Sequence, residues 1–206
     1  MKVIGLSGGI ASGKSVVAKQ LVSLGAGLLD ADKAGHEVLK EAEVKHQLAQ
    51  RFGPGILDPQ GEIHRPALAK IVFEPTPAGK QALAELEQIT HPRIGNKLQA
   101  QLHAWQAAGR YPVAVLDAPV MDKAGWNRFC DEIWFIDCPE VIRMKRAGTR
   151  GWSDEEFRQR EAAQPALDLK KSQADRIIQN NNTLESLQAQ TTQHWQRLVD
   201  SSAPPS

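Results

Sequence analysis

The sequence has few of the features that mark secreted, membrane or nucleic-acid-binding proteins. Only Cys130 and Cys138 occur among 206 residues, which excludes a disulfide scaffold and indicates a reducing compartment. The formal net charge is +1, so no bulk electrostatic attraction to nucleic acid or membrane surfaces is expected. No apolar run is long enough to span a bilayer, and no signal peptide is visible. These absences predict a cytoplasmic protein that binds neither nucleic acid nor membrane.

Histidine and internal repeats add no further signal. The six histidines show no spacing typical of metal ligands, and we interpret most of them as surface or packing residues. The hydrophobic content of 41% and charged content of 24% are ordinary for a globular chain. The length predicts one α/β domain with inserted pieces.

Residues 8–15 carry the strongest functional signal. They read GGIASGKS and match G-x-x-x-x-G-K-[ST], the phosphate-binding loop pattern. Its glycines let backbone N–H groups point at one anion, next to the positive end of the following helix. In such a loop Lys14 reaches the β and γ phosphates, and the Ser15 hydroxyl holds Mg²⁺.

The context supports this interpretation over a glycine-rich turn that binds nothing. Residues 2–7 form a short apolar run typical of a buried strand. Val17, Leu21 and Leu24 then recur at i, i+4 and i+7, the spacing of one helix face. Strand, glycine loop and helix are the order that the motif requires.

Two later strands are predicted to end in acids. Residues 28–32 read as a strand whose end places Asp32 at the ligand crevice, where a catalytic base belongs. The alternative is that Asp32 only caps the next helix, and position alone does not decide between them. Residues 111–117 form another apolar strand, and its terminal Asp117 resembles the acid that supports Mg²⁺ in phosphate-loop proteins.

The remaining pattern predicts the architecture. Strands over 133–138 and 174–178 complete a five-stranded parallel sheet with helices on both faces, an α/β fold. Between the second and third strands the sequence predicts helices only. We expect one helix over about 33–51, others starting at Arg65 and Thr76-Pro77, and a separate one opened by Thr90-His91-Pro92.

Charges of both signs are dense from residue 143 to 171. Ser153 and Glu156 form a capping box, which places a loop over 148–152 between two helices. Most of these charges suit a solvated helical hairpin with i, i+4 pairs. The functional alternative is that one or two arginines face the phosphate loop, because phosphoryl transfer needs cations over the migrating group.

The chain resembles the dephospho-CoA kinase family along nearly its whole length, in motifs that occur in the family's order. Each motif alone is less specific than the combination. The shared motifs are the loop Gly8–Ser15, Asp30-Ala31-Asp32, Arg65 with Leu68 and Phe73, His91-Pro92, Asp117-Ala118-Pro119, Arg160 with Gln164, Lys170, and Ala174–Asn180.

The resemblance implies ATP-dependent phosphorylation of the ribose 3′-hydroxyl of dephospho-CoA, with ATP and Mg²⁺ as cofactors, on a P-loop kinase fold like that of nucleoside monophosphate kinases. It implies a core over about 1–33, 90–140 and 172–200, an acceptor-binding insertion over 34–89 and a lid over 143–168.

It also implies the roles of single residues. Asp32 is the expected base, with Lys14 and Arg146 or Arg150 as catalytic cations. The expected ligands are Gly9, Ile10, Ala11, Ser12, Gly13, Lys14, Ser15, Val16 and Asn180 for the nucleotide, Asp32, His36, Arg65, Leu68 and His91 for the acceptor, and Ser15 and Asp117 for the metal.

The sequence departs from the family pattern in several places. Ala11 replaces a glycine, and its methyl group fits if φ at this residue stays below zero. Val16 replaces a threonine beside the metal-binding hydroxyl. Gln179 replaces an acid beside Asn180, and residues 121–123 have no family counterpart to carry over.

Two other functions compete with this expectation. One is a kinase for another small hydroxyl acceptor, which would use the same loop and lid. The other is a nucleotide-binding switch or partner-regulating ATPase that needs no acceptor. The expected assembly is a monomer or small homo-oligomer.

Overall fold

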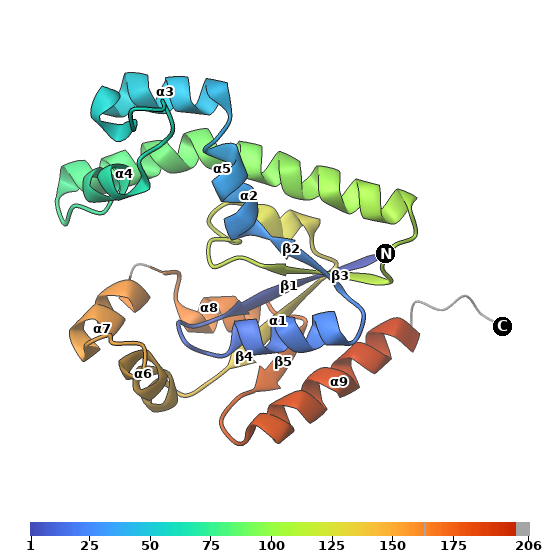
Figure 1. Ribbon diagram of the computed structural model, residues 1–206. Coiled ribbons are helices and arrows are strands. Elements are labelled where there is room, and N and C mark those ends of the chain that lie inside the picture. Colours follow the sequence, from blue (N-terminus) through green and yellow to red (C-terminus); the bar gives the residue numbers. More distant parts are fainter. Residues whose placement is uncertain (163, 201–206) are drawn as a thin grey trace. The chain divides into compact units, whose positions relative to one another are not determined.

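A parallel sheet lies at the centre of the fold. The computed structural model describes residues 1–162 and 164–200 (Figure 1). Within them the strands follow the order β2-β3-β1-β4-β5, and the β1–β3, β1–β4 and β4–β5 pairs are parallel. The predicted five-stranded parallel sheet is thereby confirmed. The strands are β1 Lys2–Gly8, β2 Gly27–Asp30, β3 Val113–Asp117, β4 Glu132–Asp137 and β5 Arg176–Gln179.

Helices connect the strands throughout the described part of the chain. The α-helices are α1 Lys14–Ser23, α2 Ala31–Val38, α3 Ala42–Phe52, α4 Arg65–Val72, α5 Pro77–Ala107, α6 Glu140–Gly148, α7 Asp154–Ala162, α8 Leu167–Ser172 and α9 Leu184–Asp200, with 3₁₀ turns η1 Pro54–Ile56 and η2 Trp126–Phe129. None of the described helices combines the length and apolarity needed to cross a bilayer.

The chain divides into two compact units. Unit 1 comprises residues 1–29 together with the described residues from 102 onward, and it contains the sheet. Unit 2 comprises Asp30–Gln101 and contains α2, α3, α4 and most of α5.

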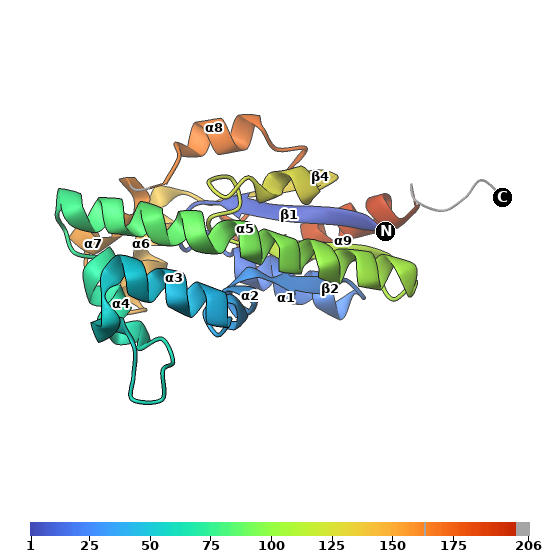
Figure 2. The same cartoon turned by 90° about the horizontal axis from the view of Figure 1, so that it is seen from above.

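The core of unit 1 explains why its strands read as apolar runs. α1 and α9 pack on one face of the sheet, and α8 contacts β1 and β4. Figure 2 shows α8 and α1 on opposite sides of β1. Helices cover both faces of a parallel sheet, so the residues that point to either face are buried. Its strands therefore show no alternation of apolar and polar residues. The hydrophobic core between the sheet and helices α1 and α9 includes Ile4, Leu6, Val17, Leu21, Val115, Ile136, Ile178, Leu187 and Leu198.

Unit 2 holds a smaller core of its own. Val44 and Leu48 of α3, Ile56 of η1, and Leu68 and Val72 of α4 are all buried. Their i, i+4 spacing on each helix places them on one face, which is how short amphipathic helices form a stable unit. The predicted absence of strands between β2 and β3 agrees with this, apart from an isolated antiparallel bridge between Leu57 and Ile63.

The predicted helix start at Thr90-His91-Pro92 is wrong. α5 runs unbroken from Pro77 to Ala107 with Pro92 inside it. Proline removes one backbone donor from a helix. Close by in the same helix, the Thr90 hydroxyl donates to the Leu86 carbonyl at 2.8 Å. The predicted start at Pro77 is confirmed.

Two boundaries near residue 30 also differ from the predictions. The expected helix over 33–51 is two helices, because the chain turns at residues 39–41 between α2 and α3. The second strand ends at Asp30, not Asp32, because Asp30 adopts an extended conformation and starts α2.

Candidate active site

The phosphate-loop motif adopts the predicted strand–loop–helix arrangement. β1 ends at Gly8, the loop follows, and α1 begins at Lys14. Gly13 precedes α1 with φ of +105°, a conformation that favours glycine. A Cβ at Gly13 would clash with Nδ2 of Asn180, so the position excludes any side chain. The N-terminal N–H groups of α1 thus remain directed toward the loop, where an anion binds.

Ala11 contradicts the expectation of a negative φ. Its φ is +57°, the left-handed region, which among the described residues no other non-glycine occupies. A methyl group in this region costs about 1 kcal/mol relative to glycine. The loop therefore carries backbone strain at a position where it curls around its ligand.

Lys14 is folded back over the loop. Its Nζ donates to the carbonyls of Gly8 and Gly9, both at 3.0 Å. Burial lowers the pKa of the Lys14 ammonium from 10.5 to about 8. The nearby Asp117 carboxylate raises this pKa, and the positive charges of Lys170, Arg143 and Arg150 lower it. The site is thus rich in cations, which is what a polyphosphate requires.

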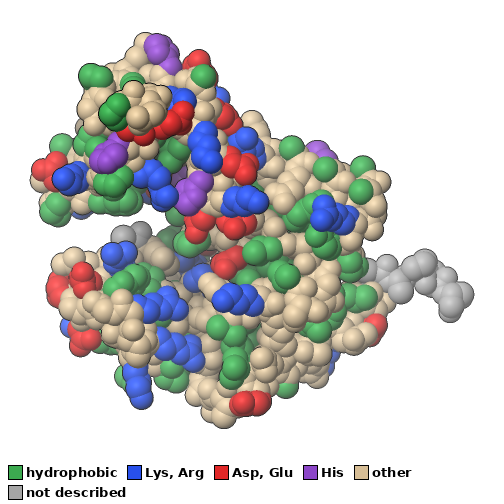
Figure 3. Space-filling model, in the orientation of Figure 1, with side chains coloured by type: hydrophobic (Ala, Val, Ile, Leu, Met, Phe, Trp, Pro, Cys, Tyr) green, Lys and Arg blue, Asp and Glu red, His purple; other side chains and the backbone are tan. Residues whose placement is uncertain are grey.

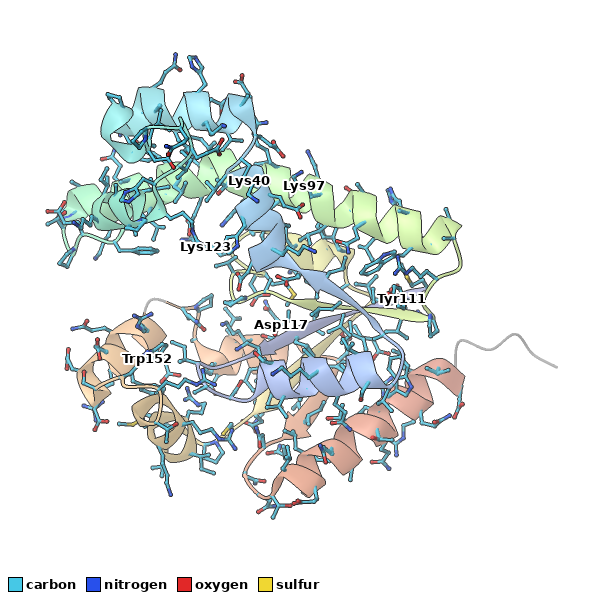
Figure 4. The ribbon with its side chains drawn as sticks, in the orientation of Figure 1. Lys40, Lys97, Tyr111, Asp117, Lys123 and Trp152 are labelled. Atoms are coloured by element: carbon cyan, nitrogen blue, oxygen red, sulfur yellow. The ribbon has the colours of Figure 1, made fainter. Side chains whose placement is uncertain are left out.

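Ser15 and Asp117 provide hard oxygen donors of the kind that Mg²⁺ prefers. Ser15 lies in the first turn of α1. Asp117 ends β3 and pairs in register with Leu6 of β1, and Figure 4 shows it near the start of α1. Within residues 1–162 and 164–200 no cluster of three His, Cys, Asp or Glu side chains forms a complete metal site. One hydroxyl and one carboxylate suit Mg²⁺ that takes its other ligands from phosphate and water.

Arg146 and Asn180 hydrogen-bond to the backbone of the phosphate loop. The Asn180 amide is buried and donates to the Ser12 carbonyl at 2.7 Å. The Arg146 guanidinium donates to the same carbonyl at 3.4 Å and to Oδ1 of Asn180 at 3.2 Å. The structure thus brings both predicted residues onto the loop backbone, where their hydrogen bonds hold the Ser12 carbonyl.

Arg150 lies in the loop between α6 and α7 and is exposed. Its charge still reaches Lys14, whose pKa it lowers. Figure 3 shows Lys and Arg side chains gathered over α6 and toward α1. The predicted capping box at the start of α7 is present, with Ser153 N donating to Glu156 at 2.8 Å. Residue 163, inside the predicted lid, lies outside the described residues.

Two cations at the loop are missing from the predicted site residues. Arg143 is 3% exposed and its guanidinium lies against Gly9. Lys170 is 5% exposed, donates to Gln164 at 3.0 Å and lines a small cavity with Lys14. The spacing of Arg143 and Arg146, i and i+3 on α6, is a signal that could have identified the first. Lys170 belongs to the motifs that the chain shares with the family it resembles.

The predicted acceptor residues belong to unit 2. Asp30 accepts a hydrogen bond from Lys33 N at 2.8 Å and so caps α2, which removes the alternative in which Asp32 is the cap. Asp32 is exposed in the first turn of α2. Of the others, His36 is exposed on α2, Arg65 is exposed at the start of α4, Leu68 is buried and His91 lies within α5.

These features define a class of protein. A parallel sheet, a glycine loop at the carboxyl end of its central strand, and a half-buried lysine at a helix N-terminus are the phosphate-binding apparatus of a P-loop kinase. Comparison with known proteins narrows the class to one family.

The family model for dephospho-CoA kinase matches residues 2–186 of the chain. Dephospho-CoA kinase of Symbiobacterium thermophilum is 39% identical over 198 residues, which cover 95% of this chain and 80% of that protein. The enzyme of Geobacter sulfurreducens is 38% identical, with 95% and 98% covered. The solved dephospho-CoA kinase of Campylobacter jejuni superposes with a TM-score of 0.74 at 26% identity, covering 98% of this chain and 100% of that one. The chain belongs to the dephospho-CoA kinase family.

Proposed function

We propose that this chain transfers the γ-phosphoryl group of ATP to the ribose 3′-hydroxyl of dephospho-CoA, giving coenzyme A and ADP. Membership of the family supports the reaction and the use of ATP. The observation that carries the proposal is the positively charged loop around the half-buried Lys14, whose charge suits a polyphosphate.

The loop residues bind and orient the nucleotide. Backbone N–H groups of residues 9–16 hold the phosphates, and Lys14 places its charge on the β and γ oxygens. Ser15 and Asp117 would hold Mg²⁺, which when bound neutralises charge on the phosphates. Because Asn180 and Arg146 fix the Ser12 carbonyl, the loop needs little rearrangement to bind.

Asp32 is the proposed base. A ribose hydroxyl is a poor nucleophile, and a carboxylate within hydrogen-bond reach both orients it and accepts its proton. Asp32 is free of the capping role, which Asp30 fills. In this proposal unit 2 supplies the acceptor side through His36, Arg65, Leu68 and His91, and the segment over 143–168 closes as a lid that carries Arg146 and Arg150 and excludes water.

The proposal extends to the setting of the enzyme. We infer a cytoplasmic monomer or small homo-oligomer. The cytoplasmic location is supported by the two described cysteines, which are both free thiols, as a reducing compartment favours.

The test is ADP release measured with ATP and Mg²⁺ across a panel of acceptors. Dephospho-CoA should stimulate release far above the rate without acceptor, and the product should be coenzyme A phosphorylated at the 3′ position. Adenosine, shikimate and simple sugars serve as competing acceptors, and Lys14→Ala serves as the inactive control. ADP release that is independent of acceptor, or highest with another acceptor, would contradict the proposal.

A further inference from the structure

Arg143 on α6 is a buried cation in contact with the phosphate loop. Only 3% of the residue is exposed, and a buried guanidinium is stable only when its charge and donors are matched. Its Nε donates to the Cys138 carbonyl at 2.9 Å, and its Nη1 is paired with the Glu161 carboxylate of α7. The guanidinium carbon lies 5.4 Å from the ring centre of Phe157. The carbonyl and the ring contribute no formal charge, so Glu161 supplies the neutralising one.

The guanidinium reaches the loop backbone at Gly9. A Cβ at Gly9 would lie 2.6 Å from Nη1 of Arg143 and 3.0 Å from its guanidinium carbon. Any side chain at this position would therefore displace the arginine. Arg143 also lowers the pKa of Lys14, which shows that its charge is felt where the phosphates bind. The cation thus lies at the anion-binding surface while its counter-ion lies on α7.

The negative charge of Glu161 is stabilised by the cations beside it. It lies in the last turn of α7, where the negative end of the helix dipole disfavours a carboxylate. Burial lowers the pKa of Lys170, a second buried cation that borders the same cavity as Lys14, and the charges of Asp122 and then Glu161 oppose that change. Glu161 therefore compensates Arg143 directly and shares the compensation of Lys170 with Asp122. A polyphosphate arriving there offers those cations more negative charge than Glu161 does.

We propose that Arg143 binds the nucleotide phosphates and that Glu161 is its exchangeable counter-ion, which the phosphates displace from the guanidinium. This inference rests on the proposed use of ATP and adds a residue pair to it. Guanidinium binds carboxylate and phosphate oxygens alike, and Nη1 of Arg143, which contacts Glu161, is also the atom nearest to Gly9 of the loop. Because Glu161 competes with the phosphates, it weakens nucleotide binding and sets its affinity.

The sign of one effect separates this exchange from a purely structural ion pair. If Glu161 competes with phosphate, Glu161→Gln tightens phosphate binding, whereas loss of a structural contact weakens binding or leaves it unchanged. Arg143→Gln should weaken binding about tenfold, the usual worth of one hydrogen bond to a charged group. In the double variant Arg143→Gln/Glu161→Gln the gain should vanish, because the competitor has nothing left to compete for.

The experiment is titration calorimetry of the full chain with inorganic tripolyphosphate and with ATP, each with Mg²⁺. We expect Glu161→Gln to lower the dissociation constant for tripolyphosphate by about five- to tenfold, the converse of removing one charged hydrogen bond. The matched control is Glu155→Gln, which removes the same charge from the exposed face of α7, where its carboxylate accepts from Gln159 at 2.9 Å. The control should bind like the unchanged chain.

Thermal unfolding covers the case in which Glu161→Gln is unstable. Without ligand, the variant should unfold at a lower temperature than the unchanged chain, because Arg143 is left unpaired. Tripolyphosphate should raise the unfolding temperature of the variant by more than it raises that of the unchanged chain. Glu161→Asp retains the charge at a shorter reach and should show a smaller gain in the same direction.

Equal or weaker binding by Glu161→Gln, or a gain that persists without Arg143, overturns the inference. If the variants bind in the expected order but the chain does not phosphorylate dephospho-CoA, only the proposed function fails. If the chain phosphorylates dephospho-CoA and the variants bind alike, only the inference fails.

Discussion

At the scale of single residues, the charge on Lys14 is the most sensitive quantity in the site. Burial brings the pKa of its ammonium down to about 8, although Asp117 opposes the change. The proton is therefore lost within the range where kinases are assayed. An uncharged amine gives no electrostatic stabilisation to the transferring phosphoryl group.

The first prediction follows from this pKa. For the unliganded enzyme, kcat/KM for ATP should fall as pH rises through about 8, because Lys14 loses its charge there. Lys14→Arg, whose charge persists, should be slower but should lack this alkaline limb. The measurement is a pH profile of kcat/KM for both forms, and an alkaline limb that is identical in the variant would rule out Lys14.

Stability should change in the opposite direction. The unfolded chain keeps the Lys14 proton to about 10.5, whereas the folded chain releases it near a pKa of about 8. Between these values the unfolded state binds more protons, so this residue makes the folded chain more stable as pH rises.

The second prediction concerns the strained Ala11. Because its φ is +57°, Ala11→Gly should relieve the methyl clash and raise the free energy of unfolding by up to about 1 kcal/mol. Denaturant titration measures this change. The control is Ala18→Gly in the interior of α1, which should be destabilised by a lost core methyl and by helix propensity. A destabilised Ala11→Gly would show that the loop does not hold this conformation.

The third prediction tests Asp32 as the base. Asp32→Asn should lower kcat about 10²- to 10⁴-fold, the contribution of general base catalysis, with the dissociation constant for ATP unchanged. Asp30→Asn is the matched control, since asparagine caps a helix as well as aspartate does and the bond to Lys33 persists. Near-normal turnover by Asp32→Asn would remove this carboxylate from the mechanism.

At the scale of elements, α6 and α7 form a hairpin held by contacts at both ends. Ser153 and Glu156 cap α7, and the Arg160 guanidinium lies 4.3 Å from the ring centre of Trp152, labelled in Figure 4. Arg143 on α6 contacts Glu161 near the far end of α7. These contacts hold α6 and α7 together, with Arg143 and Arg146 of α6 both against the phosphate loop.

The fourth prediction separates two arginines of this hairpin. Arg146 donates to Ser12 and Asn180, so Arg146→Ala should lower the free energy of unfolding by about 1 kcal/mol as well as turnover. Arg150 is exposed, so Arg150→Ala should change stability by less than about 0.5 kcal/mol while lowering kcat up to about a hundredfold. Stability and kcat are measured on the same preparations. If neither variant lowers kcat more than ATP affinity, the hairpin is structural.

The sequence was sufficient for elements that follow from local patterns. The strands read as apolar runs because a doubly covered parallel sheet buries both faces, and the phosphate loop is a contiguous motif. The capping box at Ser153 was found for the same reason.

Features that depend on tertiary contacts were predicted less well, and for the burial of Arg143 the only signal was its i, i+3 spacing from Arg146. The spacing of charges in 143–171 suggested a solvated hairpin, yet Arg143 is buried because the loop and Glu161 lie against it. Helix α5 continues through Pro92, against its local preference. Ala11 adopts a positive φ because the loop closes around it, which composition does not reveal.

At the scale of the whole molecule, the two cysteines report on unfolding of unit 1. Burial raises the pKa of Cys130 to about 12, with help from Asp131 and Asp122, and burial also raises the pKa of Cys138. A thiol reacts through its thiolate, so both cysteines should be unreactive while unit 1 is folded. Cys138 also lies beside Arg146, whose Nη1 is 3.5 Å from the Cys138 sulfur and donates to the Ser12 carbonyl of the phosphate loop.

The fifth prediction is therefore that thiol labelling follows opening of the nucleotide site. With an aromatic disulfide reagent, the native chain should react slowly and the chain in guanidinium chloride at once. If Cys138 reacts only from an open state that cannot bind nucleotide, ATP at about 100 times its dissociation constant should slow labelling about a hundredfold. Cys130→Ala isolates Cys138, and Lys14→Ala, which binds ATP weakly, should lose the protection. Labelling of Cys138 that ATP does not slow would mean that the sulfur becomes accessible without disruption of the phosphate loop.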